Sequence, residues 1–196
     1  NFSFDYGNVH ITCLDSNPYA NPLDRDLLLW LINDLKTSKA DWKIVAYHHP
    51  AFNTSISHYD DQQMRLIAPI LEEQKVDLVL AGHVNNYQRS FPLKFELKLD
   101  SSGTRYVVSP EGRVDGTFTL DQKFDGVTNT RPEGIIYIVS GSGGARLYDA
   151  PLTNNPELWK HDKPGNWVPF TVKLVADIHS FTRIETDGKK LVLKQM

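Results

Sequence analysis

The chain has 196 residues and a single cysteine, Cys13, which excludes a disulfide bond within the chain. No stretch approaches the roughly 18–20 consecutive apolar residues of a membrane-spanning helix, so we expect no membrane partner. Positive charge is not in excess, because 21 Lys and Arg stand against 24 Asp and Glu, a formal net charge of −3. Without a basic surplus the chain has no general field for holding nucleic acid, and we expect no such partner.

Several common catalytic motifs are absent as well. There is no Gly-x-Ser-x-Gly turn for a serine nucleophile, and Cys13 has no nearby base in the sequence. The glycine-rich stretch 141–144 neither completes a dinucleotide fingerprint nor ends in the Lys-Ser/Thr of a phosphate-binding loop. We interpret it as a turn at the edge of a site.

The composition is that of an ordinary globular protein, with 40% hydrophobic, 11% aromatic and 23% charged residues. Within residues 1–90, strand-like and helix-like segments alternate. Strands are predicted at 9–14, 42–47 and 76–81, and helices at 23–35 and 61–74, the second with a kink or late start at Pro69. This order predicts an α/β fold with parallel strands.

Residues 91–196 show a different pattern. Short strands are predicted at 93–99, 104–109 and 135–139, and a hairpin at 181–186 and 190–194 around Asp187-Gly188. We expect mostly antiparallel strands and long loops here, with a surface excursion over 147–169. The two parts, 1–90 and 91–196, are expected to belong to one domain.

Two of the seven histidines follow predicted strands. His48 comes directly after strand 42–47, and His83 follows strand 76–81 after Gly82. A right-handed crossover between the two strands brings both histidines to the carboxyl edge of the sheet, where open α/β sheets bind ligands. Two neutral imidazoles can supply half of a coordination sphere for a zinc-, iron- or manganese-type ion, although each could instead only bond backbone at a strand end.

The other histidines carry weaker signals. The side chain of His49 should point away from that of His48, so we interpret it as a packing or supporting residue. His58 lies in a polar loop and could protonate a leaving oxygen, or simply be exposed. His10, His161 and His179 show no partner spacing and are interpreted as structural or exposed.

Two segments resemble the last two motif blocks of the purple acid phosphatases, within the calcineurin-like metallophosphoesterases. The segments read VAYHHP at 45–50 and AGHVNNYQRS at 81–90, against family blocks V-x-x-H and G-H-x-H. The stretches 2–10, 14–16, 134–144 and 179–193 resemble other parts of the family, so the likeness spans nearly the whole chain. The implied fold is a layered β-sandwich with flanking helices, of which this chain would hold the C-terminal part.

The resemblance implies hydrolysis of a phosphate ester at two divalent or trivalent metal ions of iron, zinc or manganese type, by a metal-activated hydroxide. His48 and His83 would ligate the same metal. His58 would contact the phosphate and donate a proton to the leaving oxygen. Tyr87 and Arg89 would support the backbone of the site.

Two departures from the family pattern limit this expectation. Asn85 stands where G-H-x-H has a second histidine that binds the other metal, and an amide oxygen is a weak substitute for imidazole at such a site. The earlier blocks of the family, including G-D-x-x-Y and G-N-H, do not occur in the 196 residues. We therefore expect an N-terminal segment of the same domain to be the partner that completes the site, and this chain to hold one metal or none.

Three functions remain open from the sequence. The first is a metal-dependent acid phosphatase or phosphodiesterase, secreted or in the cell envelope as the resemblance suggests. The second is a catalytically degenerate module that binds or interacts through the same scaffold. The third is a mononuclear metal site of another class.

Overall fold

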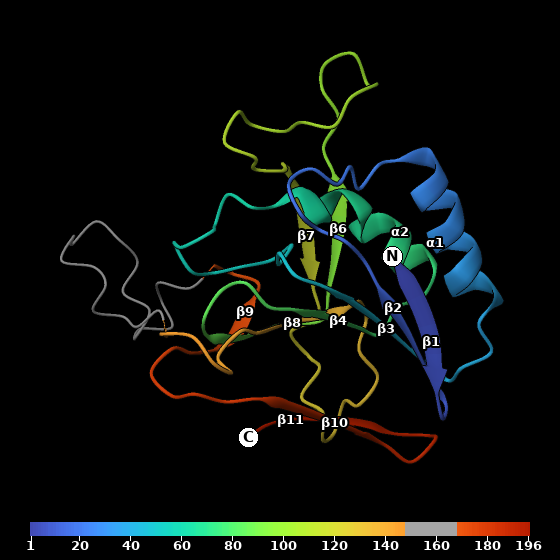
Figure 1. The fold of residues 1–196 in the computed structure, drawn as a ribbon, viewed down its shortest axis with the longest axis vertical. Coiled ribbons are helices and arrows are strands. Elements are labelled where there is room, and N and C mark those ends of the chain that lie inside the picture. Colours follow the sequence, from blue (N-terminus) through green and yellow to red (C-terminus); the bar gives the residue numbers. More distant parts are fainter. Residues whose placement is uncertain (148–167) are drawn as a thin grey trace.

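The computed structural model describes residues 1–147 and 168–196, and these form one large sheet and two small ones (Figure 1). The large sheet has seven strands in the order β1-β2-β3-β4-β8-β5-β9. Their bounds are β1 Phe2–Tyr6, β2 Val9–Cys13, β3 Trp42–Tyr47, β4 Leu78–Ala81, β8 Ile136–Ser140, β5 Tyr87–Ser90 and β9 Thr171–Val175. The predicted α/β class is therefore confirmed.

Strand directions divide the large sheet into a parallel centre and antiparallel margins. Strands β2, β3, β4 and β8 run parallel, whereas β1 pairs antiparallel with β2, and β5 pairs antiparallel with both β8 and β9. The parallel pairing predicted for the first part is confirmed. The mostly antiparallel second part has one exception in β8, whose buried run Tyr137, Ile138 and Val139 suits the covered centre of a parallel sheet.

Helix α1 (Arg25–Thr37) covers one face of the sheet. It begins two residues later than the sequence predicts, because the Asp24 carboxylate accepts hydrogen bonds from the backbone N–H groups of Asp26 and Leu27 and so caps the helix. Its apolar stripe is directed at the core, where Leu31 and Leu35 are fully buried.

The helix predicted over 61–74 forms as two short pieces. A 3₁₀ turn, η1 (Gln63–Ile67), leads into α2 (Ala68–Glu73), and Pro69 occupies the first turn of α2. Proline is tolerated there because the first N–H groups of a helix have no partner within the helix. The late start predicted from Pro69 is therefore confirmed.

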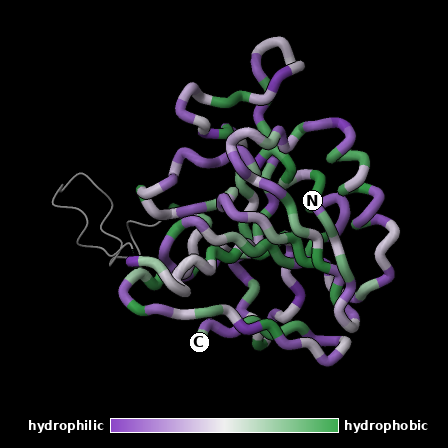
Figure 2. The backbone as a smooth tube through the Cα atoms, viewed as in Figure 1, coloured by the Kyte–Doolittle hydropathy of each residue, from purple (hydrophilic) through white to green (hydrophobic). Residues whose placement is uncertain are grey.

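The two faces of the large sheet are covered differently (Figure 1). The larger core lies under α1, α2 and the pair β6 (Leu93–Leu97) and β7 (Gly116–Leu120). The smaller core lies under the hairpin of β10 (Thr182–Thr186) and β11 (Leu191–Gln195). Hydrophobic residues concentrate along the central strands between these layers (Figure 2), and the hairpin predicted around Asp187-Gly188 is confirmed.

Other local predictions fared less well. Residues 104–109 form only isolated bridges, Leu99 with Tyr106 and Val108 with Val114, because this stretch is largely exposed. The sequence analysis did not identify β1, β5, β7 or β9 as strands. Most of the surface excursion predicted over 147–169 lies outside the described residues. No helix among the described residues has the length and apolar character that crossing a membrane requires.

Candidate metal centre

The two strand-end histidines meet at the carboxyl edge of the parallel strands, as predicted. Tyr47 at the end of β3 is in register with Ala81 at the end of β4, so His48 and His83 leave the sheet side by side. Nε2 of His48 lies 3.1 Å from Nδ1 of His83. The side chain of His48 is exposed and that of His83 is half-buried, so solvent reaches the pair.

This spacing fits two ligands of one cation. A zinc-type ion lies about 2.0–2.1 Å from an imidazole nitrogen, so two such nitrogens are about 3.0 Å apart at right angles and about 3.4 Å apart in a tetrahedron. Burial lowers the pKa of the His83 imidazole, and the neighbouring imidazoles lower it further. A lowered pKa favours the neutral form of imidazole, which is the form that binds metals.

His58 also reaches this place. Its Nδ1 lies 2.9 Å from Nε2 of His83 and 3.1 Å from Oδ2 of Asp61, which in turn lies 3.4 Å from Nε2 of His83. The sequence analysis named His58 but missed Asp61. The only sequence signal for Asp61 was that it lies three residues after His58. Its proximity to His83 is set by the fold.

The backbone is strained at two of these histidines. His58 has φ +60° and His83 has φ +63°, in the left-handed region that residues other than glycine rarely adopt. Lys75 has a similar φ of +58°, but it follows α2, where a left-handed residue ordinarily ends a helix. No helix end accounts for His58 and His83, and strain of this kind clusters at functional sites.

Ser16 fixes the backbone of His48 and His49 and the ring of His49. Its buried Oγ accepts the backbone N–H groups of His48 at 3.0 Å and His49 at 2.9 Å. Both lone pairs are thereby used, so the hydroxyl hydrogen is left for Nδ1 of His49, 3.0 Å away. His49 then carries its proton on Nε2, which leaves no lone pair for a cation and supports its predicted role as a supporting residue.

Sequence reasoning missed Ser16 as a site residue. Within the sequence, Ser16 belongs only to the stretch 14–16 that resembles the family, and a lone serine after a strand carries no signal of its own. Its role depends on β2 lying beside β3, which brings the residue to the backbone of His48.

Asn85 takes part in a loop contact. Its Nδ2 donates a hydrogen bond of 3.0 Å to the backbone carbonyl of Arg146. The adjoining Val84 carbonyl lies so close to Gly141 that a Cβ on residue 141 would overlap it. The glycine stretch 141–144, interpreted as a turn at the edge of a site, thus supports the loop that carries His83.

A buried network of polar side chains joins the loop before His58 to the loop after His83. Its centre is Gln88 on β5, whose Oε1 accepts the N–H of Thr54 at 2.8 Å. Its Nε2 lies 2.8 Å from Oδ1 of Asn53 and 2.9 Å from Oδ1 of Asn86. The exposed fraction of these four residues is 1–3%, so the two loops are held together by hydrogen bonds that water does not reach.

The remaining histidines lie elsewhere. His10 is buried and bonded to Asp5 and Asp34, and Nδ1 of His179 donates a hydrogen bond of 3.0 Å to the backbone carbonyl of Ser142. His161 lies outside the described residues. Tyr87 is buried in β5 and packs in the smaller core, and Arg89 lies two residues further along the same strand, so the support expected of both for the site stays a prediction.

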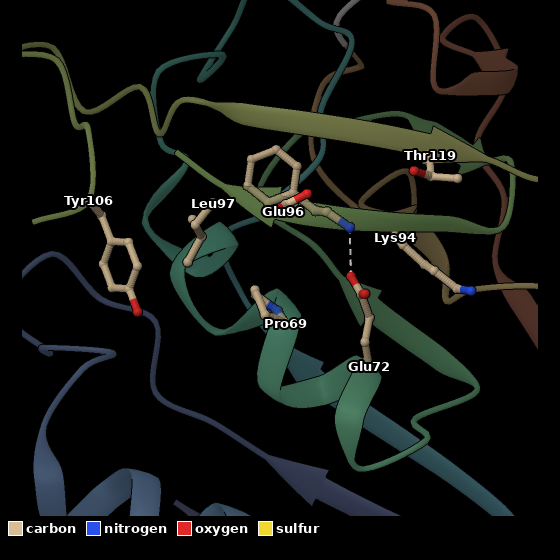
Figure 3. A pocket seen from close by; sticks show the side chains of 8 residues that line it. Pro69, Glu72, Lys94, Glu96, Leu97, Tyr106 and Thr119 are labelled. Atoms are coloured by element: carbon tan, nitrogen blue, oxygen red, sulfur yellow. Dashed lines mark hydrogen bonds between the residues drawn. The ribbon is translucent and has the colours of Figure 1, made fainter. Parts of the chain in front are cut away.

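One hollow of about 480 Å³ is lined by residues of α2, β6 and β7 (Figure 3). It is open to solvent between α2 and β6 and contains none of the candidate site residues. The Glu72 carboxylate at its edge accepts the backbone N–H of Phe95 at 2.6 Å and so serves the packing of α2 on β6.

Comparison with known proteins points to one family. Residues 1–87 match the family model of the calcineurin-like phosphoesterases. Purple acid phosphatase 21 of Arabidopsis thaliana is 34% identical over 117 residues, covering 57% of this chain and 26% of that protein. Phosphoenolpyruvate phosphatase of Allium cepa is 32% identical over 185 residues, covering 86% of this chain and 37% of that protein.

The fold has a counterpart among solved structures. A purple acid phosphatase from yellow lupin seeds superposes on 99% of this chain and 29% of its own with a TM-score of 0.65, at 17% identity. The layered α/β architecture expected from the family resemblance is confirmed by this match. The chain spans about a quarter to just over a third of the length of the two curated relatives named above.

Proposed function

Because the chain belongs to the calcineurin-like phosphoesterase family, we propose that its protein is a metal-dependent hydrolase of phosphate esters. The observation that carries this proposal is the 3.1 Å spacing of Nε2 of His48 and Nδ1 of His83 at the carboxyl ends of neighbouring parallel strands. A bound iron-, zinc- or manganese-type cation offsets phosphoryl charge and makes water a better nucleophile near neutral pH.

His48 and His83 hold the cation, and Ser16 restrains the backbone at the end of β3. Ser16 Oγ accepts the backbone N–H groups of His48 and His49, which fixes the point from which the His48 side chain leaves the strand. The buried network around Gln88 joins the loop before His58 to the loop after His83. The pair is thereby organised before any substrate arrives.

His58 is the proton donor in this proposal. Its Nδ1 faces His83 and Asp61, which assigns Nε2 to the proton that passes to the leaving oxygen of the ester. Its side chain is 36% exposed, so a substrate entering from solvent reaches it. Imidazole is the commonest general acid and base among side chains, which suits His58 to this transfer.

The described residues supply part of a two-metal site. Asn85, which stands in the place of the other metal's histidine, donates to the Arg146 carbonyl. We include in the proposal that residues outside this sequence supply the remaining ligands within the same domain. Secretion or location in the cell envelope belongs to the same hypothesis.

Hydrolysis of p-nitrophenyl phosphate by the full-length protein, loaded with zinc, iron or manganese, tests the proposal. We expect turnover that falls at least about 100-fold in His48→Ala and His83→Ala, because each removes a ligand. The control is Gln122→Ala, which truncates an exposed side chain that belongs to none of the site's elements. Asn85→His should raise metal content. Absence of both metal and turnover in the wild type and in Asn85→His would contradict the proposal, and phosphate-ester binding without turnover would instead support a non-catalytic module.

A further inference from the structure

Three ligand atoms from three side chains form a small triangle beside the His48–His83 pair. They are Nδ1 of His58, Oδ2 of Asp61 and Nε2 of His83, and their separations are 2.9, 3.1 and 3.4 Å. Oδ2 of Asp61 is a carboxylate oxygen, and the other two atoms are imidazole nitrogens. Each atom can therefore offer a lone pair to the same point.

Hydrogen bonds alone cannot satisfy this triangle. If His58 and His83 each direct an N–H at Asp61, two hydrogens crowd between nitrogens that are 2.9 Å apart. If His83 instead donates to His58, then Nδ1 of His58 and Oδ2 of Asp61 face each other at 3.1 Å as two acceptors. With Asp61 as a carboxylate, each of these assignments leaves one of the three contacts unfavourable.

A cation satisfies all three contacts at once. A point about 2.1 Å from each atom, the usual ligand distance of zinc, lies about 1 Å from the plane of the triangle. Two imidazoles and a carboxylate on one face of a cation suit zinc, iron or manganese, and the two nitrogens disfavour magnesium and calcium. The left-handed backbone of both His58 and His83 is what turns the two rings towards this point.

Asp61 is directed into the triangle by a local turn. Its backbone N–H donates to the carbonyl of His58 at 3.2 Å, which folds the segment so that residues 58 and 61 share a side. The neighbouring Asp60 points elsewhere and forms an ion pair with Arg113. The two adjacent carboxylates are therefore distinct, and Asp60 provides a matched control for Asp61.

We propose that His58, Asp61 and Nε2 of His83 form a cation position of their own, which competes with the His48–His83 position for His83. A neutral imidazole has one lone pair on nitrogen, so His83 serves one position at a time. This inference rests on the proposed function. A cation in the triangle inhibits hydrolysis, because it binds the His58 imidazole needed for proton transfer and removes His83 as a ligand of the His48–His83 position.

Zinc binding to the protein carrying His48→Ala tests this position directly, by equilibrium dialysis at constant pH. Removing His48 abolishes the first position and leaves the three atoms of the triangle in place. The side chain of His48 is exposed, so we expect the variant to keep its fold, which circular dichroism checks. We expect Asp61→Asn, added to His48→Ala, to weaken zinc binding at least about 10-fold. Asp60→Asn in the same background should change it less than about twofold.

A second measurement uses the protein with His48 in place. Excess zinc should inhibit phosphate-ester hydrolysis, and Asp61→Asn should relieve that inhibition while Asp60→Asn does not. Zinc binding that is unaffected by Asp61→Asn in the His48→Ala background overturns the proposal. Because binding is measured without turnover, failure of the proposed hydrolase activity leaves the dialysis result standing, and failure of the triangle leaves hydrolysis intact.

Discussion

Nε2 of His10 on β2 lies 3.0 Å from Oδ2 of Asp34 on α1, which ties the helix to the large sheet by a buried imidazole. Nδ1 of His10 contacts Asp5 at 2.7 Å, so both ring nitrogens face carboxylates. Burial by itself lowers the pKa of His10, but the hydrogen bonds to Asp34 and Asp5 outweigh it, and the net pKa is raised. Burial raises the pKa of Asp34, but hydrogen bonds led by that of Ser3 outweigh it, and the net pKa is lowered.

These opposite shifts predict how stability depends on pH. The His10 contribution is fully present below the unfolded pKa of about 6.5 and is lost as pH rises through its raised folded pKa. The Asp34 contribution is present above the unfolded pKa of about 3.9 and is lost as pH falls through its lowered folded pKa. Urea unfolding should therefore show greater stability near pH 5.5 than near pH 8.5. In Asp34→Asn this difference should shrink, and an equal difference in that variant would contradict the pairing.

Replacement of Gln88 by methionine should destabilise the protein by at least about 2 kcal/mol. Methionine has a similar volume but leaves the N–H of Thr54 and the side-chain carbonyl of Asn86 buried without the Gln88 amide, and Asn53 keeps only its bond from Ser55 N–H. Chemical denaturation measures the loss. The exposed Gln122 provides the control, because Gln122→Met should change stability by less than about 0.5 kcal/mol. Equal effects of the two variants would show that the buried network contributes nothing.

Gly141→Ala should disturb the loop that carries His83. The new Cβ would overlap the carbonyl oxygen of Val84, so that loop must move, at a cost of about 1–3 kcal/mol. Zinc affinity should fall together with stability, because Val84 directly follows His83. Gly144→Ala is the matched control, since a Cβ there meets no atom within 4 Å. Unchanged zinc binding in Gly141→Ala would show that the contact between Gly141 and Val84 does not affect the metal centre.

Lys75→Gly should stabilise the protein by about 0.5–1 kcal/mol. Lys75 holds φ at +58° after α2, and the N–H of Val76 reaches the carbonyl of Leu71 across it, the hydrogen bond that closes a helix with a left-handed residue. Glycine adopts this conformation without the steric cost of a Cβ. Thermal unfolding provides the measurement. Lys36→Gly in the last turn of α1 should instead destabilise by about 1 kcal/mol, and a destabilised Lys75→Gly would refute the strain at that position.

The sequence by itself determined the parallel strands β2, β3 and β4 and the placement of His48 and His83 at their ends. These follow from local signals, because apolar runs, turn residues and the handedness of crossovers are written in short segments of chain. The family resemblance was also readable from two such segments, 45–50 and 81–90. Strand β5 carries no such signal, because it consists of polar and aromatic residues and only its neighbours in the sheet make it a strand.

Only the tertiary structure decided which side chains join those two histidines. Ser16, Asp61 and Gln88 are ordinary polar residues in the sequence, and each acquires its role from a partner that sequence patterns do not identify. Ser16 reaches the backbone of His48 across 32 positions, and Asp61 meets His83 although η1, α2 and β4 lie between them in the sequence. Periodicity and motif spacing record what a segment does locally, whereas a hydrogen bond or a shared cation depends on where two distant segments meet after folding.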